Sequence, residues 1–179
     1  MVLELIGAFS ITQESIDNAA LMYFRKKTPC LATFVRKNAF ARLRDDERPG
    51  LLAALADELE VPADRSNFKM VFNRVKMLRD FVAHAAVVEL VDEDSVQIVR
   101  NFHVGPDNPE SPIKAVTRIE LEARLHDCRW LSQHVNYLLA RSELVVQTYI
   151  GDQQIEFVDP SAKPEDWNGR EYRPLDAAT

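Results

Sequence analysis

The chain has 179 residues, of which 46% are hydrophobic and 28% charged, a mix typical of an ordinary globular domain with a core. Its 5 glycines and 9 prolines exclude a low-complexity chain, and its longest apolar runs are too short to cross a membrane. The net charge of −6 disfavours nucleic acid as a partner of the chain taken as a whole.

The charge is unevenly distributed along the chain. Residues 20–79 contain 13 Lys or Arg against 7 Asp or Glu, whereas 1–19, 80–150 and 151–179 are each net negative. The basic first half can attract phosphate groups, although the solvated faces of helices produce the same pattern.

Neither a metal site nor an export signal is expected. Cys30 and Cys128 lie far apart and form no metal-binding motif. Residues 1–11 are apolar but include Glu4 and lack a basic start, so they are a poor signal peptide. We therefore expect reduced cysteines, a cytoplasmic location, no metal, no cofactor and no membrane partner.

Capping signals and apolar spacing predict three helices before residue 60. The capping box Ser10–Gln13 begins a helix that runs to about Lys27, where Thr28-Pro29 ends it. A second helix is expected to reach about Arg44. After a polar turn, four leucines predict a short third helix over 51–59.

Residues 66–86 form the centre of the predicted fold, with Asp64 or Ser66 as the helix cap. Apolar side chains recur there at helical spacing, so a helix would bury one stripe in the core. The stripe consists of Phe68, Val71, Phe72, Val75, Leu78, Val82 and Ala85.

The pattern then changes to β-branched residues. Two runs within about 87–102, joined by the polar turn 92–95, predict a β-hairpin. Residues 105–112 hold three prolines and a glycine and are expected to form a loop.

A capping box at Thr117–Glu120 predicts a last helix that extends to about Tyr149. At about 30 residues and roughly 45 Å, this helix is longer than a small core needs, so part of it is expected to pack on another subunit.

We expect residues 1–150 to form one mainly α-helical bundle of four to five helices with the inserted hairpin. Residues 151–179 are rich in prolines and acids and contain a short strand at 155–158. They are predicted to be an extended acidic tail, mobile unless it docks through Trp167 or Tyr172. Its removal should then cost the fold little.

Arg79 and His84, near the end of the fourth helix, are the residues that point to a chemistry. A histidine with a pKa near neutrality can exchange the proton of an RNA 2′-hydroxyl. An arginine binds the phosphate and the negative charge that develops on it. This scheme requires no metal and yields a 2′,3′-cyclic phosphate and a 5′-hydroxyl.

In a regular helix the two side chains do not share a face, because five positions correspond to about 140° of rotation. A distortion before His84 would bring them together, as would the reach of the long Arg79 side chain. A two-fold dimer in which each subunit gives an arginine and a histidine to one cleft is a third solution.

The run Leu78-Arg79-Asp80-Phe81-Val82-Ala83-His84 resembles the motif of the HEPN superfamily. These proteins are all-α bundles marked by an arginine and, after four to six intervening residues, a histidine at the end of a core helix. The resemblance implies a metal-independent endoribonuclease, often a toxin or defence factor, with a composite cleft in a homodimer and an antitoxin as a possible partner. Arg79 and His84 would be catalytic, and Asp80 would orient them.

Four cations, Arg74, Lys76, Arg36 and Lys37, are candidates to guide an RNA backbone. The structural alternative is that Arg79 pairs with a carboxylate while His84 caps the helix C-terminus. The corresponding functional alternative is a non-catalytic HEPN-like binding or regulatory module that acts through dimerisation. A purely structural oligomerisation domain is the third.

Overall fold

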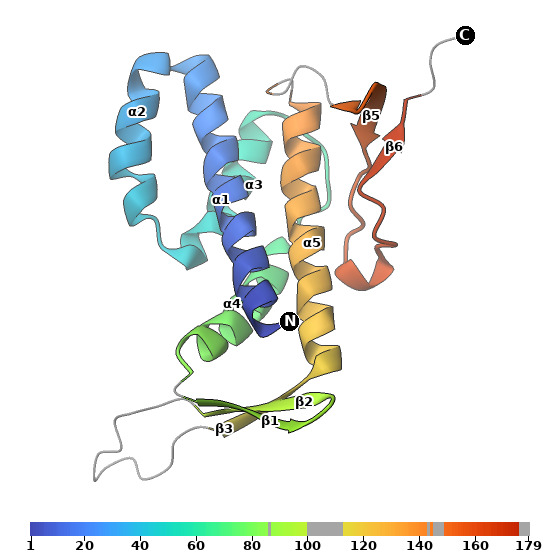
Figure 1. Cartoon of the computed structure of the whole chain (residues 1–179). Coiled ribbons are helices and arrows are strands. Elements are labelled where there is room, and N and C mark those ends of the chain that lie inside the picture. Colours follow the sequence, from blue (N-terminus) through green and yellow to red (C-terminus); the bar gives the residue numbers. More distant parts are fainter. Residues whose placement is uncertain (86, 100–112, 143, 145–148, 176–179) are drawn as a thin grey trace.

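The computed structural model describes residues 1–85, 87–99, 113–142, 144 and 149–175. This part of the chain is mainly helical, with two small antiparallel sheets (Figure 1). The α-helices are α1 (Val2–Lys27), α2 (Pro29–Asn38), α3 (Arg48–Glu58), α4 (Phe68–Ala83) and α5 (Arg118–Arg141). Three short 3-10 helices are η1 (Phe40–Arg42), η2 (Asp45–Glu47) and η3 (Pro164–Asp166).

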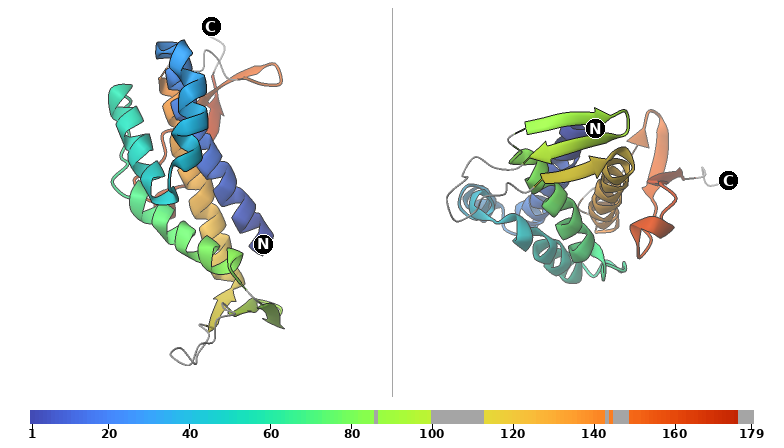
Figure 2. Two further views of the ribbon diagram at one scale, coloured as in Figure 1. Left: turned by 90° about the vertical axis from the view of Figure 1, so that its left-hand side faces the viewer. Right: turned by 90° about the horizontal axis from the view of Figure 1, so that it is seen from below.

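The helices pack around α1 and α5, which lie side by side along the length of the molecule (Figures 1 and 2). Helices α2, α3 and α4 also contact α1, and α4 contacts α5. The core between them is formed by fully buried side chains from α1, α4 and α5: Leu5, Phe9, Ile16, Val71, Phe72, Val75, Leu131, Val135 and Leu138.

Helix α1 begins earlier than the sequence predicted. Ser10 is not an N-cap, since its hydroxyl donates to the Ile6 carbonyl inside the helix. Leu5 and Phe9 are fully buried and extend the apolar stripe of Ile16 toward the N-terminus. Tertiary burial of this stripe therefore overrides the capping signal.

The break at Thr28-Pro29 is confirmed, but the next boundaries differ from the prediction. Helix α2 ends at Asn38, and the expected polar turn is partly helical. Pro49 lies in the first turn of α3, where its missing N–H costs nothing, so α3 starts at Arg48.

Helix α4 confirms the predicted central helix and its stripe, which is buried from Phe68 to Val82. Asn67 is the N-cap and gives no side-chain cap, so neither predicted cap residue serves α4. Asp64 instead accepts a hydrogen bond from the Ser66 backbone N–H in the preceding turn.

The predicted hairpin is confirmed as β1 (Val87–Asp92) paired with β2 (Ser95–Val99). A third strand that the sequence analysis missed, β3 (Ile113–Thr117), pairs with β2 and gives the order β1-β2-β3. This sheet lies across the lower end of the bundle (Figure 1). The predicted loop 105–112 is outside the described residues.

Helix α5 starts as predicted, because the Thr117 side chain accepts the Glu120 backbone N–H. It ends at Arg141, before the predicted end, and Tyr149 belongs to a strand. The predicted end at about Tyr149 is therefore wrong, and residues 143 and 145–148 lie outside the described part.

The C-terminal segment forms the second sheet and packs along α5. Strand β5 (Gln153–Phe157) lies between β4 (Tyr149–Ile150) and β6 (Tyr172–Pro174). Trp130 Nε1 donates to the Ser161 carbonyl, and Trp167 is only 6% exposed. The expected strand is present, and the segment docks through Trp167.

Candidate functional site

Arg79 lies on the face of α4 opposite to the solvent-exposed face. Met70 and Met77 are 57% and 73% exposed, and His84 continues their spacing of seven residues. Arg79 lies about 180° from Met70 around the helix axis. It therefore faces the interior of the molecule while the methionines face solvent.

Arg79 is held by two carboxylates and an aromatic ring. Its guanidinium donates to Asp45 of η2 and pairs with Asp80 at 3.0 Å. It also lies 4.7 Å from the centre of the Phe9 ring, a cation–π contact. Its side chain is 18% exposed, so these partners replace most of its water.

The Arg79 contacts belong to a larger ion-pair network that ties α4 to α1 and α3. Asp45 also accepts from Arg48 at 2.8 Å, and Arg48 donates two hydrogen bonds to Asp17 of α1. Lys76 is 2.6 Å from Asp80. Such partly buried, multiply bonded pairs contribute more than isolated surface pairs.

His84 is the C-cap of α4 and its side chain is exposed. Its backbone N–H donates to the Asp80 carbonyl at 3.2 Å, so no distortion precedes it. Within the described residues its imidazole makes no hydrogen bond or ion pair. One subunit thus keeps Arg79 and His84 apart, in the arrangement that the structural alternative anticipated.

A groove runs beside the exposed stripe of α4, where α4, β3 and the first turns of α5 meet. Its volume is about 460 Å³. It is lined by Arg74, Met77, Leu78, Phe81, Lys114, Glu120 and Arg124. The charged side chains in the lining are three cations and one carboxylate, and each of the three cations is ion-paired. His84 is not among these lining residues, although it follows Phe81 by three positions at the end of α4.

Asp127 lies beneath the groove and fixes two of its cations. It accepts two hydrogen bonds from Arg74, at 2.7 and 3.1 Å, and one from Arg124 at 2.6 Å. Burial raises the pKa of Asp127, while both guanidinium groups oppose this by favouring the carboxylate. Arg74 also contacts Glu165, and Lys114 pairs with Glu120 at 2.8 Å.

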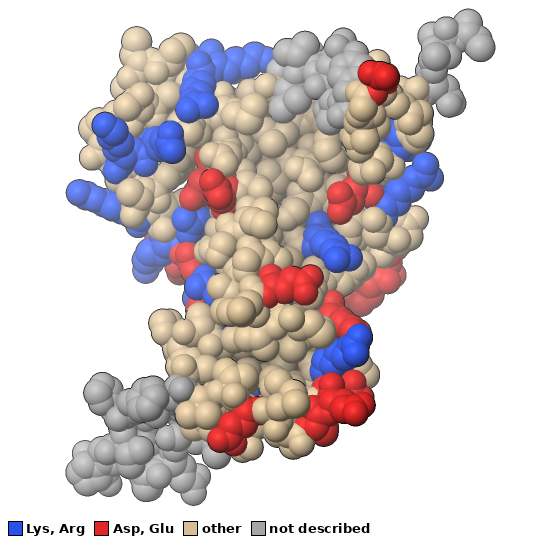
Figure 3. Space-filling view, viewed as in Figure 1, with Lys and Arg blue, Asp and Glu red and all other residues tan. Residues whose placement is uncertain are grey.

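Arg36 and Lys37 lie far from this cluster, on α2. Both are exposed, and Phe34 on the same helix is 63% exposed. Lysine and arginine side chains gather over α2 and the end of α1, whereas acidic side chains gather at the sheet end (Figure 3). A basic surface with an exposed aromatic ring fits a nucleic-acid backbone and a stacked base.

No group of three or more His, Cys, Asp or Glu side chains suited to a metal occurs in the described part of the chain. Burial raises the pKa of Cys128 to about 12, so its thiol stays protonated at neutral pH. His126 is hydrogen-bonded to the Pro164 carbonyl.

Lys114 and Arg124 were not identified from the sequence. Arg124 and Asp127 have the spacing of a helical ion pair, which was a visible signal. Their meeting with Arg74 depends on how α4 packs against α5, and Lys114 lies on the strand that was missed. No sequence period encodes either arrangement.

Comparisons with models of protein families, with curated protein sequences and with solved structures found no match. The HEPN resemblance therefore rests on the run 78–84 and on its place at the end of α4. A search of the described helices for one long and apolar enough to span a membrane found none.

Proposed function

We propose that the protein is a HEPN-type, metal-independent endoribonuclease that acts as a homodimer. The observation that supports the proposal is the exposed His84 imidazole at the C-terminal end of α4, the helix that contributes Arg74 and Met77 to the groove. A proton-transfer group beside an array of fixed cations is what cleavage of RNA by its own 2′-hydroxyl needs.

In this mechanism Arg74, Lys114 and Arg124 bind the phosphate backbone in the groove. His84 removes the proton of the 2′-hydroxyl, and the oxygen attacks the adjacent phosphorus. The bond from phosphorus to the 5′ oxygen breaks, and that oxygen takes a proton from the protonated His84 of a second subunit. The products are a 2′,3′-cyclic phosphate and a 5′-hydroxyl.

The HEPN resemblance assigns Arg79 to the reacting phosphate, and Asp80 to its orientation. For this role a substrate phosphate would have to replace Asp45 as the main partner of Arg79. Arg36 and Lys37 would hold the flanking RNA on α2, and Lys76 would contribute charge near Asp80. A toxin–antitoxin or defence setting, with an antitoxin protein as partner, is part of the same proposal.

A non-catalytic HEPN-like binding or regulatory module is the second candidate. The observation in its favour is the placement of Arg79, which is occupied by Asp45 and Asp80 on the inner side of α4. There Arg79 would stabilise the packing of η2 against α4, and the exposed stripe would serve dimerisation alone.

The deciding experiment measures RNA cleavage and stability together for His84→Ala, Arg79→Ala and Asp45→Ala, with the exposed Arg42→Ala as a charge control. Loss of the general acid–base histidine should lower activity by about 10²–10⁴-fold. The free energy of unfolding of the His84→Ala variant should change by only about 0.5 kcal/mol, because the side chain is exposed. RNA with 2′-deoxy sugars should resist cleavage, and EDTA should have no effect.

Asp45→Ala separates the two roles of Arg79. If Arg79 acts on phosphate, releasing it should preserve or raise activity, whereas Arg79→Ala abolishes it. If Arg79 is structural, both changes should destabilise the protein, Asp45→Ala also through the lost hydrogen bond from Arg48, and any activity should fall only as stability falls. Wild-type protein that binds RNA without cutting it would establish the binding-module function instead.

A further inference from the structure

Strand β1 is an edge strand whose outer side is unpaired within the described residues. The sheet order is β1-β2-β3, so alternate N–H and C=O groups along the 6 residues of β1 point away from β2. An exposed edge of this kind is a template for another strand. β1 contains neither lysine nor proline, but it carries Glu89 and Asp92, and its pairing with β2 shifts register between Leu90 and Asp92.

Both faces of β1 expose apolar side chains. Val87 and Val88 are 42% and 47% exposed, and Leu90 and Val91 are 76% and 58% exposed. Leu90 pairs with Val96, which in turn pairs with Val116, so these three side chains share the face turned toward the helices. Val116 is fully buried, whereas β1 projects beyond the helices.

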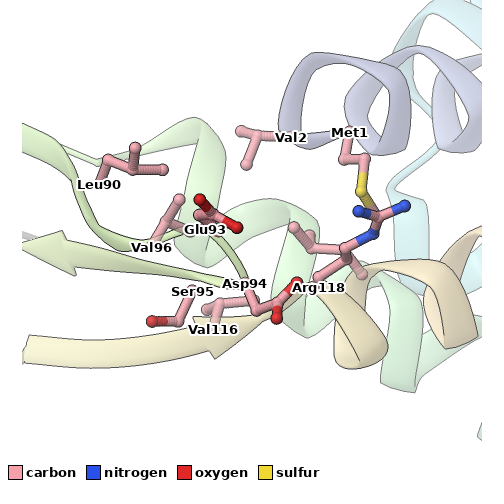
Figure 4. Close-up of a pocket in the computed structure, with 10 residues that line it drawn as sticks. Met1, Val2, Leu90, Glu93, Asp94, Ser95, Val96, Val116 and Arg118 are labelled. Carbon is pink, nitrogen blue, oxygen red and sulfur yellow. The ribbon is translucent and has the colours of Figure 1, made fainter.

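A cavity of about 260 Å³ opens on this face, between the sheet and the first residues of α1 and α5 (Figure 4). Leu90, Val96 and Val116 line it from the sheet, and Val2 and Leu121 line it from the helices. A strand added beside β1 would place every second side chain on this face. One apolar side chain of that strand would reach over Leu90 into the cavity.

The charge around the edge is acidic. Glu89 and Asp92 lie on β1, and Glu93 and Asp94 form the turn beside the cavity. Arg118 is the cation in the lining, and it pairs with Glu122 at 2.9 Å. Figure 3 shows acidic side chains at this end of the molecule, where the sheet lies.

We propose that β1 and the adjacent cavity bind an extended peptide segment of another protein as a fourth strand. The segment alternates apolar residues, one of which fills the cavity, with lysine or arginine residues that face the acidic edge. A second copy of this chain fits less well, because it would place the same carboxylates opposite one another. The β1 edge and its cavity are a different site from the groove beside α4, and this inference does not rest on RNA cleavage.

The test uses blocked nine-residue peptides in which valine alternates with lysine, glutamate or serine. Fluorescence anisotropy should show that the lysine peptide binds at least about tenfold more tightly than the glutamate peptide, and less tightly as salt rises. Hydrogen exchange should slow at the β1 amides in the complex, which only strand addition at this edge explains.

Leu90→Lys should abolish lysine-peptide binding, whereas Ile119→Lys is the matched control. Both positions carry apolar side chains of similar exposure, 76% and 78%, so neither change should affect folding. Reversal of Glu89 and Glu93 to lysine should shift the preference to the glutamate peptide.

Four results would overturn the proposal. The first is the absence of binding by every peptide, and the second is equal binding of the lysine and glutamate peptides. The third is protection of amides outside β1. The fourth is a dimer of the unliganded protein that Leu90→Lys dissociates, which would assign the edge to a second copy.

Discussion

At the scale of single residues, the buried His134 is the least expected side chain in the molecule. It is 1% exposed, and both ring nitrogens lack a hydrogen-bond partner within the described part. Its ring packs edge-on against Trp130 and Phe68, with centroids 4.2 and 5.4 Å away. Burial, assisted by the charge of Arg65 and opposed by Asp64, lowers the pKa of His134 to about 3.

This lowered pKa makes the fold sensitive to acid. Between pH 6.5 and about 3 the unfolded chain binds a proton at His134 that the folded chain does not, so stability falls as pH falls. Relative to His134→Leu, the wild type should lose about 2 kcal/mol of unfolding free energy between pH 7.5 and pH 5. Urea unfolding at the two pH values measures this difference.

At pH 7.5 the leucine variant should be about as stable as the wild type, since an imidazole without partners gains no hydrogen bond from the fold. His84→Leu, the same substitution at an exposed histidine, serves as the control variant. Parallel pH profiles for the wild type and His134→Leu would mean that His134 finds a proton acceptor in the folded state.

At the scale of elements, the sequence predicted what depends on local pattern. The stripe of α4, the hairpin, the Thr117 cap and the break at Thr28-Pro29 are local signals, and each is present in the structure. The predictions that were wrong concern packing between segments that are distant in the sequence. The docking of the C-terminal segment rests on bonds from α5, and the placement of Arg79 rests on Asp45, which precedes it by more than thirty residues.

The docked C-terminal segment should matter for stability, contrary to the expectation from its composition. A chain ending at Pro160 loses the buried Trp167, leaves Trp130 Nε1 and His126 without their backbone partners, and leaves Gln133 with only the Val158 carbonyl. We expect a loss of about 3–5 kcal/mol from the buried aromatic ring alone, measured by urea unfolding.

Two single variants show whether this loss comes from docking. Trp167→Ala should account for most of it, whereas Tyr172→Ala, at a position 42% exposed, should change stability little. A truncated chain as stable as the full one would mean that the segment is loosely attached in solution.

At the scale of the whole molecule, basic side chains gather over α2 at one end, and acidic side chains lie at the sheet end and across the middle of the same face (Figure 3). In the proposed function, RNA would contact the basic surface over α2 and also the groove beside β3 at the sheet end. Between them lies the exposed stripe of α4, with Met70, Met77 and His84. Exposed apolar side chains at a spacing of seven residues are the pattern by which one helix packs on another.

We therefore expect a homodimer that forms through α4 and places the two His84 side chains near its two-fold axis. Met70→Glu combined with Met77→Glu should convert the dimer to a monomer at tens of micromolar, because charges would be buried in an apolar contact. Each residue is exposed in the subunit, at 57% and 73%, so the fold should keep its stability. Light scattering measures the mass, and Leu3→Glu, at an 82% exposed position on α1, is the matched control.

If the catalytic groups come from two subunits, RNA cleavage should fall with the dimer fraction in the double variant and recover as its concentration is raised. A wild-type monomer at these concentrations, or a dimer that survives the double variant but not Leu3→Glu, would refute assembly through α4 and with it the two-histidine mechanism.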